Sequence, residues 1–178
     1  MSETKTRFFP LVKDERWGLR LHQTDLAINK ILAASSRKAR DFADIVAITA
    51  NMCPLGPLVM AAAGKPPAYS PQRFIEQVRL HAQSIQDDEY TAVRGLPIDW
   101  TPRFIRDDVT RQADLAETYI MSAPVDVVAS SALTDMAPPV EVTTDSIKTA
   151  ILRNATNEPE VMPVPAEFGT SPWDRSGN

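Results

Sequence analysis

Apolar residues recur at the three-to-four-residue spacing of an α-helix through most of the first 123 positions. Ile28, Ile31 and Leu32 share one face of a helix that we expect to run from an N-cap at Thr24 to about Ser36. Further helices are expected at residues 39–51, 54–64, 71 onward, 87–95 and 102–123. The last three follow residues that favour helix N-caps, namely Ser70, Asp87 and Thr101.

Two short strands are expected before these helices. Residues 7–12 are aromatic and aliphatic, residues 17–22 alternate apolar with polar side chains, and the charged turn 13–16 joins them. Pro10 lacks a backbone donor, so the first strand is expected at an edge or with a bulge. A two-stranded hairpin is barely stable alone, yet the sequence shows no obvious third strand downstream.

The final third of the chain has a different composition. Seven of the fifteen prolines fall in the last 55 residues, where the helical periodicity fades. We therefore predict a mainly α fold, an irregular helix bundle with a short N-terminal β-hairpin and a Pro-rich, partly disordered C-terminal tail. The predicted helical domain covers residues 1–123 and the weakly structured tail 124–178, with local structure near 126–133 and 146–154 and disorder from 158.

Composition excludes several classes of protein. Cys53 is the only cysteine, so neither a disulfide framework nor a Cys/His zinc site is expected. No apolar run approaches the ~20 residues that cross a bilayer, so we expect a cytoplasmic protein without membrane contact. Residues 1–40 carry a net charge of +5 and the remainder −9. The basic start either faces phosphates or is simply a solvated surface.

Three runs of sequence resemble one family. They are Arg7-Phe-Phe-Pro-Leu-Val, Trp17-Gly-Leu-Arg-Leu-His and DLAINKILAASSRKARDFADIVAI from Asp25. The later runs Pro54-Leu-Gly-Pro-Leu, Ala62-Ala-Gly-Lys-Pro-Pro and Tyr69-Ser-Pro follow in the same order. Together they are similar to the helical C-terminal half of nucleotidyltransferases of the AbiEii/AbiGii toxin family.

The resemblance implies specific roles. In that family a Gly-Ser turn precedes an Asp-x-Asp pair that holds Mg²⁺ on the NTP, whose nucleotide is transferred to an acceptor. By match to the motif, Lys30 corresponds to the lysine that contacts the nucleotide phosphates. Asp41 corresponds to the aspartate near the acceptor, with the nucleotide-binding candidates Arg37 and Arg40 beside it, and Asp44 also adjacent. Without the resemblance, Asp41 and Asp44 are better explained as acids that complement the dipole at the start of a helix.

The sequence departs from the family pattern at the metal site. Neither a Gly-Ser dipeptide nor an Asp-x-Asp triplet occurs in the 178 residues. We therefore expect no catalysis by this chain alone, and no metal site of its own. One hypothesis is that a catalytic half, from a separate chain or a longer reading frame, completes an enzyme that uses Mg²⁺ and an NTP, with RNA among the possible acceptors. The other is a non-catalytic helical interaction module that binds a protein partner such as a cognate antitoxin, through an exposed hairpin edge.

Overall fold

A computed structural model describes residues 6–16, 18–134 and 138–157 of the chain. The predicted disorder from residue 158 lies outside these residues. The fold is mainly α, as predicted from the sequence. Its helices are α1 (Gln23–Ala33), α2 (Ala39–Asn51), α3 (Leu55–Ala62), α4 (Pro71–Ser84), α5 (Asp87–Thr91) and α6 (Pro102–Ser122), with short 3₁₀ turns η1 (Ala34–Ser36), η2 (Val125–Val127) and η3 (Ser146–Lys148). No helix among the described residues is both long enough and apolar enough to cross a membrane.

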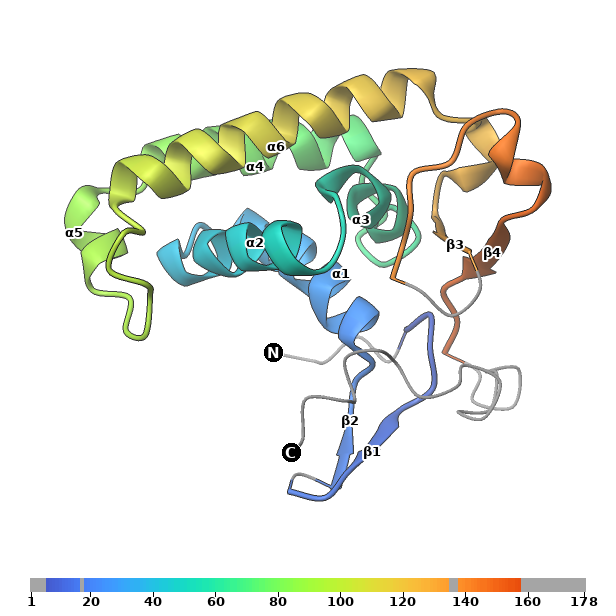
Figure 1. Ribbon diagram of the computed structural model, residues 1–178, viewed down its shortest axis with the longest axis horizontal. Helices are drawn as coiled ribbons and strands as arrows, with labels where there is room; N and C mark the ends of the chain where they lie inside the picture. The colour runs from blue at the N-terminus through green and yellow to red at the C-terminus, as the bar shows by residue number, and fades with distance from the viewer. Residues whose placement is uncertain (1–5, 17, 135–137, 158–178) are drawn as a thin grey trace.

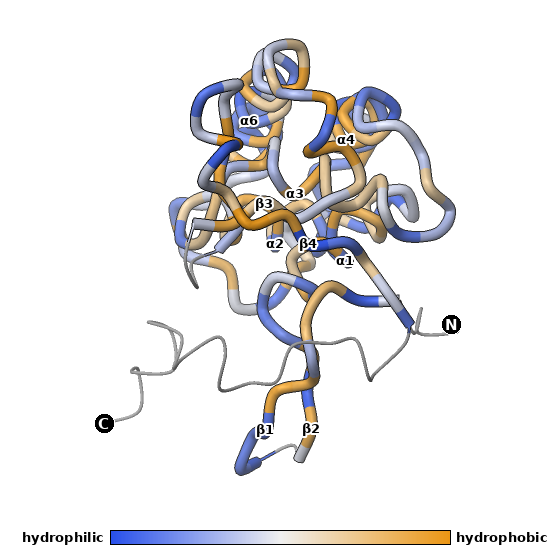
Figure 2. The backbone as a smooth tube through the Cα atoms, turned by 90° about the vertical axis from the view of Figure 1, so that its right-hand side faces the viewer, coloured by the Kyte–Doolittle hydropathy of each residue, from blue (hydrophilic) through white to orange (hydrophobic). Residues whose placement is uncertain are grey.

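The helices pack in two layers. The long helices α4 and α6 lie side by side in one layer, and α1, α2 and α3 lie beneath them (Figure 1). The core between the layers includes Phe42, Ile45 and Leu58 from the lower layer and Val78 and Val109 from the upper, all fully buried. Apolar colour follows the inward faces of these helices (Figure 2). The helical periodicity of the sequence thus marks the faces that meet in this core.

The hairpin differs from its prediction. Strands β1 (Val12–Asp14) and β2 (Gly18–Arg20) pair antiparallel, as expected, but the first begins five residues later than predicted. Phe8 and Phe9 do not belong to the strand, because the carboxylate of Asp25 accepts their backbone N–H groups and both rings are buried. The hairpin projects from the body of the molecule (Figures 1 and 2).

Two predicted N-caps were wrong by one or two residues. The N-cap of α1 is His22 rather than Thr24, because the His22 ring stacks on Phe9 and its Nδ1 atom accepts the Thr24 N–H. Gln86 rather than Asp87 precedes α5, and the carboxylate of Glu89 accepts its N–H. Short polar side chains compete closely at adjacent positions, so composition alone does not fix the capping residue.

Local structure after α6 lies where it was predicted, near residues 126–133 and 146–154, but it includes a pair of strands that the sequence did not indicate. Strands β3 (Ser130–Leu133) and β4 (Ile151–Asn154) pair antiparallel, and every residue of β3 is buried. The Ala129 N–H donates to the Met60 carbonyl, which joins this segment to α3. Arg7 and Thr156 form a further antiparallel bridge through two backbone hydrogen bonds of 2.8 and 2.9 Å. The N-terminal segment therefore does find a downstream partner, which the sequence did not reveal.

Candidate functional site

The side chains of α1 and α2 that the family resemblance singles out lie together. The ammonium of Lys30, on α1, is 3.1 Å from an oxygen of Asp41 and 2.8 Å from an oxygen of Asp44, both on α2. The side chains of Lys30 and Asp44 are about one-third exposed, whereas that of Asp41 is 10% exposed. We call these three residues the Lys30 cluster, which is open to solvent on the lysine side.

The turn between α1 and α2 brings Lys30 close to Asp41 and Asp44. Helix α1 tightens into η1, and Arg37 then adopts a left-handed backbone conformation with φ of 54°. A left-handed residue after a helix reverses the chain direction, so α2 runs back along α1. Lys30 then faces the first two turns of α2, where Asp41 and Asp44 are three residues apart on one face.

The cluster holds the lysine in its charged form. Burial alone would lower the pKa of Lys30, but hydrogen bonds and charge attraction from Asp44 and Asp41 outweigh it and raise that pKa. The cluster therefore carries one positive and two negative charges at neutral pH. An arriving anion would compete with the two carboxylates for the ammonium.

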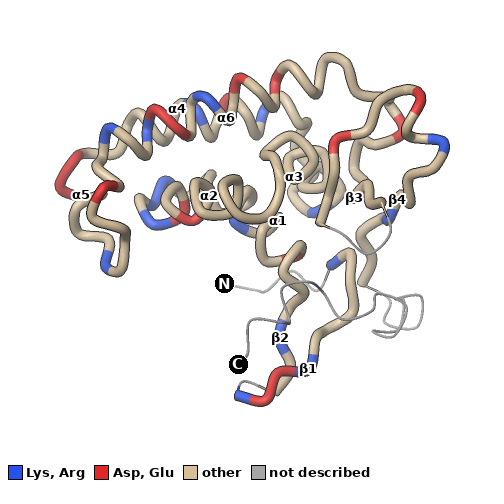
Figure 3. The backbone as a smooth tube through the Cα atoms, in the orientation of Figure 1, with Lys and Arg blue, Asp and Glu red and all other residues tan. Residues whose placement is uncertain are grey.

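A basic hollow lies at the N-terminal end of α2. It has a volume of about 450 Å³ and is lined by Arg37, Lys38, Arg40, Arg94, Ala39, Ala92, Val93 and Glu89. Four of these side chains are cationic and one is anionic. Figure 3 shows the Lys and Arg positions at the end of α2 that faces α5. Two of the predicted nucleotide-binding residues, Arg37 and Arg40, therefore lie in one concave, positively charged surface.

The position of these cations is electrostatically unusual. The N-terminal end of a helix carries a partial positive charge, so acids and not bases stabilise it. Lys38 is the N-cap of α2 and makes no side-chain capping hydrogen bond, and Arg40 follows in the first turn. Asp41 offsets part of this repulsion but is already engaged with Lys30. Helix stability does not explain the basic residues, whereas an anionic ligand would.

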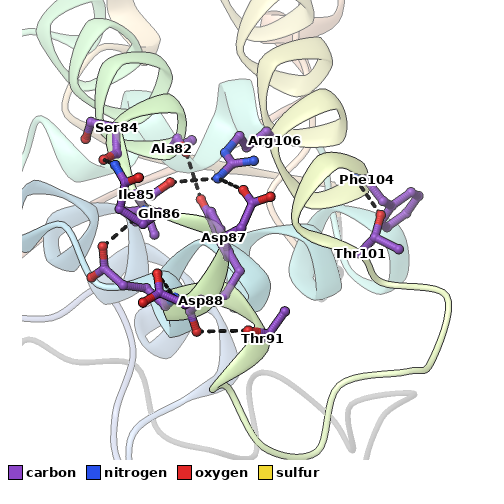
Figure 4. A network of polar contacts seen from close by, with 12 residues as sticks. Ala82, Ser84, Ile85, Gln86, Asp87, Asp88, Thr91, Thr101, Phe104 and Arg106 are labelled. Atoms are coloured by element: carbon purple, nitrogen blue, oxygen red, sulfur yellow. Dashed lines mark hydrogen bonds and ion pairs between the residues drawn. The ribbon is translucent and has the colours of Figure 1, made fainter.

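The opposite wall of the hollow is firmly built. Arg106 of α6 donates to the carbonyl of Ile85 at 2.7 Å and to Asp87 at 2.6 Å, and the buried Tyr90 hydroxyl donates to the Ala82 carbonyl (Figure 4). These bonds fix α5 between α4 and α6. Within this frame, Arg37 donates to the Ser84 carbonyl at 3.1 Å. These contacts hold α5 and the turn before α2 in place around the hollow.

The residues of the site do not fit a resident Mg²⁺ ion. Asp41 and Asp44 are close enough to share a cation, but the Lys30 ammonium already lies between them. Across residues 6–16, 18–134 and 138–157, no group of three or more His, Cys, Asp or Glu side chains is arranged to hold a metal ion. We therefore assign no metal-dependent step to these side chains.

A second lysine cluster, which the sequence did not reveal, is buried. The ammonium of Lys65 is 2.6 Å from an oxygen of Asp25 and 3.0 Å from the side-chain oxygen of Asn29. Lys65 and Asp25 are 1% and 0% exposed. Desolvation lowers the pKa of Lys65, and the Asp25 charge opposes that effect. This pair holds the α3–α4 loop and the Phe8–Phe9 segment on α1, and its burial makes it structural.

Comparisons with known proteins found no similar protein. No protein-family model, curated protein or solved structure matches this chain.

Proposed function

We propose that this chain is the phosphate-binding helical part of a nucleotidyltransferase-like protein. Two features at the N-terminal end of α2 carry the proposal: the contact between Lys30 and Asp41, and the basic hollow that contains Arg37 and Arg40. All four positions belong to the sequence run that resembles the AbiEii/AbiGii family. We further propose a cytoplasmic location, where nucleoside triphosphates are abundant.

In this proposal the triphosphate occupies the basic hollow. Arg40 and Arg94 supply charge from two sides, and the uncapped N–H groups at the start of α2 add donors. The ammonium of Lys30 then exchanges one carboxylate for a phosphate oxygen. Asp41, the more buried of the two acids, keeps its place and faces the acceptor. Nucleotide transfer would also require a Mg²⁺-holding half from a partner, and RNA is one candidate acceptor.

If phosphate competes with the carboxylates for the Lys30 ammonium, variants of the cluster should change triphosphate affinity. Isothermal titration calorimetry with Mg²⁺-ATP and the other three triphosphates measures that affinity. Lys30→Ala should weaken binding, whereas Asp44→Asn should strengthen it about two- to fivefold, because it removes a carboxylate that holds the ammonium at 2.8 Å. Lys148→Ala, on the exposed 3₁₀ turn η3, is the matched control and should leave binding unchanged.

Three results would refute the proposal. One is the absence of heat with every triphosphate. Another is unchanged binding in Lys30→Ala. The third is a loss of affinity in Asp44→Asn equal to that in Lys30→Ala, because it would show that the cluster matters only as an intact ion pair.

The hairpin supports a second candidate function, a binding site for a protein partner such as an antitoxin. Strands β1 and β2 project from the helical body (Figures 1 and 2), and the Leu19 side chain on β2 is 66% exposed. A projecting strand pair is a common template for strand addition. Copurification with a coexpressed candidate antitoxin should be lost in Leu19→Glu and retained in Leu80→Glu, which changes an equally exposed leucine on α4.

A further inference from the structure

A larger cavity lies at the opposite end of α2 from the basic hollow. It has a volume of about 1000 Å³. Its walls are residues 49–56 at the α2–α3 junction, one side of α6 between Arg111 and Ser122, and residues 141–145. Cavities of this size and mixed lining are typical of sites for small organic molecules.

The walls of this cavity are fixed in place. The hydroxyl of Tyr119, on α6, accepts the Val142 N–H at 3.2 Å and so holds the third wall. The ring of Tyr119 packs directly on Gly56, where an added Cβ atom would lie 2.6 Å from a ring carbon. Thr143 and Ser146 exchange hydrogen bonds through their hydroxyls and backbone N–H groups, which shapes the rim. These contacts hold the walls of the cavity together.

The lining of the cavity carries a net negative charge. The charged side chains that line it are Arg111, Glu141 and Asp145. Arg111 is ion-paired with Asp108, outside the lining, and Asp145 lies 3.7 Å from Lys148. No ion pair joins Glu141 to another described residue, and its side chain is exposed at the rim, where partial desolvation still raises its pKa. One carboxylate is thus left with no counter-charge.

The end of α2 adds to this negative potential. The C-terminal end of a helix carries a partial negative charge and is normally stabilised by Lys, Arg or His in its last turn. The last turn of α2 contains none, and neither does that of α6. The floor, by contrast, is apolar, with Cys53, Leu55 and Ala116 buried. The surroundings therefore favour a molecule with an apolar body and one positive charge.

We propose that this cavity binds a small organic cation, an amine with an alkyl or aryl body, whose charge pairs with Glu141 and whose apolar part rests on Leu55 and Ala116. The negative potential repels triphosphates, so the site is separate from the basic hollow. The proposal does not depend on the proposed nucleotide binding.

Benzylamine and its uncharged isostere benzyl alcohol test the charge requirement. Titration of ¹⁵N-labelled protein with benzylamine should shift, in a saturable way, the amide signals of residues 52, 53, 55, 56, 115–122 and 141–145. Benzyl alcohol should bind about two- to fivefold more weakly, because it lacks the charge that pairs with the exposed Glu141 carboxylate. Mg²⁺-ATP should leave these signals unshifted.

Two variants and a control complete the experiment. Glu141→Gln keeps the shape and removes the charge, so benzylamine should bind it no better than benzyl alcohol does. Thr118→Trp places a large ring into the cavity from an exposed position of α6 and should abolish binding of both probes. Asp126→Asn, at an exposed acid outside the lining, should change nothing. Equal binding of both probes, unshifted signals, or full benzylamine affinity in Glu141→Gln would overturn the proposal.

Discussion

Replacement of Lys65 by Met tests the buried ion pair that joins three parts of the fold. Met is unbranched and one heavy atom shorter than Lys, so it removes the charge and its hydrogen bonds with little change in volume. Asp25 would keep the two backbone N–H donors from Phe8 and Phe9 but lose the ammonium 2.6 Å away. A carboxylate that is 0% exposed would then lack a counter-charge. Breaking one side of such a pair costs about 3–5 kcal/mol, and the lost bond to Asn29 about 1 kcal/mol more.

Urea unfolding followed by circular dichroism measures this loss. The loss for Lys65→Met is expected at about 3–6 kcal/mol, which is a large part of the stability of an ordinary domain. Lys148→Met, at a lysine whose side chain is 73% exposed, should change stability by less than about 0.5 kcal/mol. Hydrogen exchange should localise the effect, because the Phe8 and Phe9 amides lose the acceptor geometry that the Lys65 charge maintains.

A double variant separates the destabilisation caused by an unpaired buried charge from that caused by lost packing. Asp25→Asn combined with Lys65→Met leaves no buried charge, so it should be less destabilised than Lys65→Met alone despite carrying two changes. If the double variant is equally or more destabilised, the cost comes from lost contacts and the electrostatic reasoning is wrong. A loss below about 1 kcal/mol for Lys65→Met would refute it as well.

Three further changes test other contacts. Gly64→Ala should destabilise the fold by about 1–3 kcal/mol in thermal or urea unfolding, because the new Cβ atom would lie 2.2 Å from the Ala129 carbonyl oxygen. Burial raises the pKa of Cys53 to about 12, so iodoacetamide should label it at pH 8 only after denaturation, and labelling of the native protein would contradict this. Tyr119→Phe removes the acceptor of the Val142 N–H and should cost about 1–2 kcal/mol, with faster exchange of that amide; an unchanged exchange rate would contradict the assigned bond.

The parts of the fold that sequence predicted well depend on local information. The bounds of α2 were predicted to the residue, because a strong apolar stripe runs between a positive-φ turn and a proline. Ser70 and Thr101 cap α4 and α6 as predicted, through hydrogen bonds within one turn of each helix. The family resemblance singled out Lys30 and Asp41, and the structure places an oxygen of Asp41 3.1 Å from the Lys30 ammonium, whereas their roles in binding and catalysis remain predictions.

The parts that were missed depend on contacts between distant residues. Lys65 and Asp25 are 40 residues apart, and each looked ordinary in its own segment, one in a loop and the other in a first helical turn. A lysine enclosed by Gly64 and Pro66 in an apolar segment was the available signal for burial. Strand β3 has small residues at three of its four positions and is buried on both faces, so it shows no alternation. Arg94 joined the site only because α5 packs beside α2.

The charges at the start of α2 predict opposite effects of one substitution on stability and on binding. Arg40 is an exposed cation in the first turn, where the helix end is itself positive, and it shares the hollow with Arg37 and Lys38. Arg40→Glu should therefore stabilise the protein by about 0.3–1 kcal/mol in urea unfolding at low salt, with a smaller gain at high salt. The same change should weaken Mg²⁺-ATP binding, because it places a carboxylate against the phosphates. If the variant is more stable but binds Mg²⁺-ATP more weakly, the basic residues at the start of α2 lower the stability of the protein and serve ligand binding. Residues with a purely structural role would not be expected to lower stability. Lower stability in Arg40→Glu, or unchanged binding, would remove that argument.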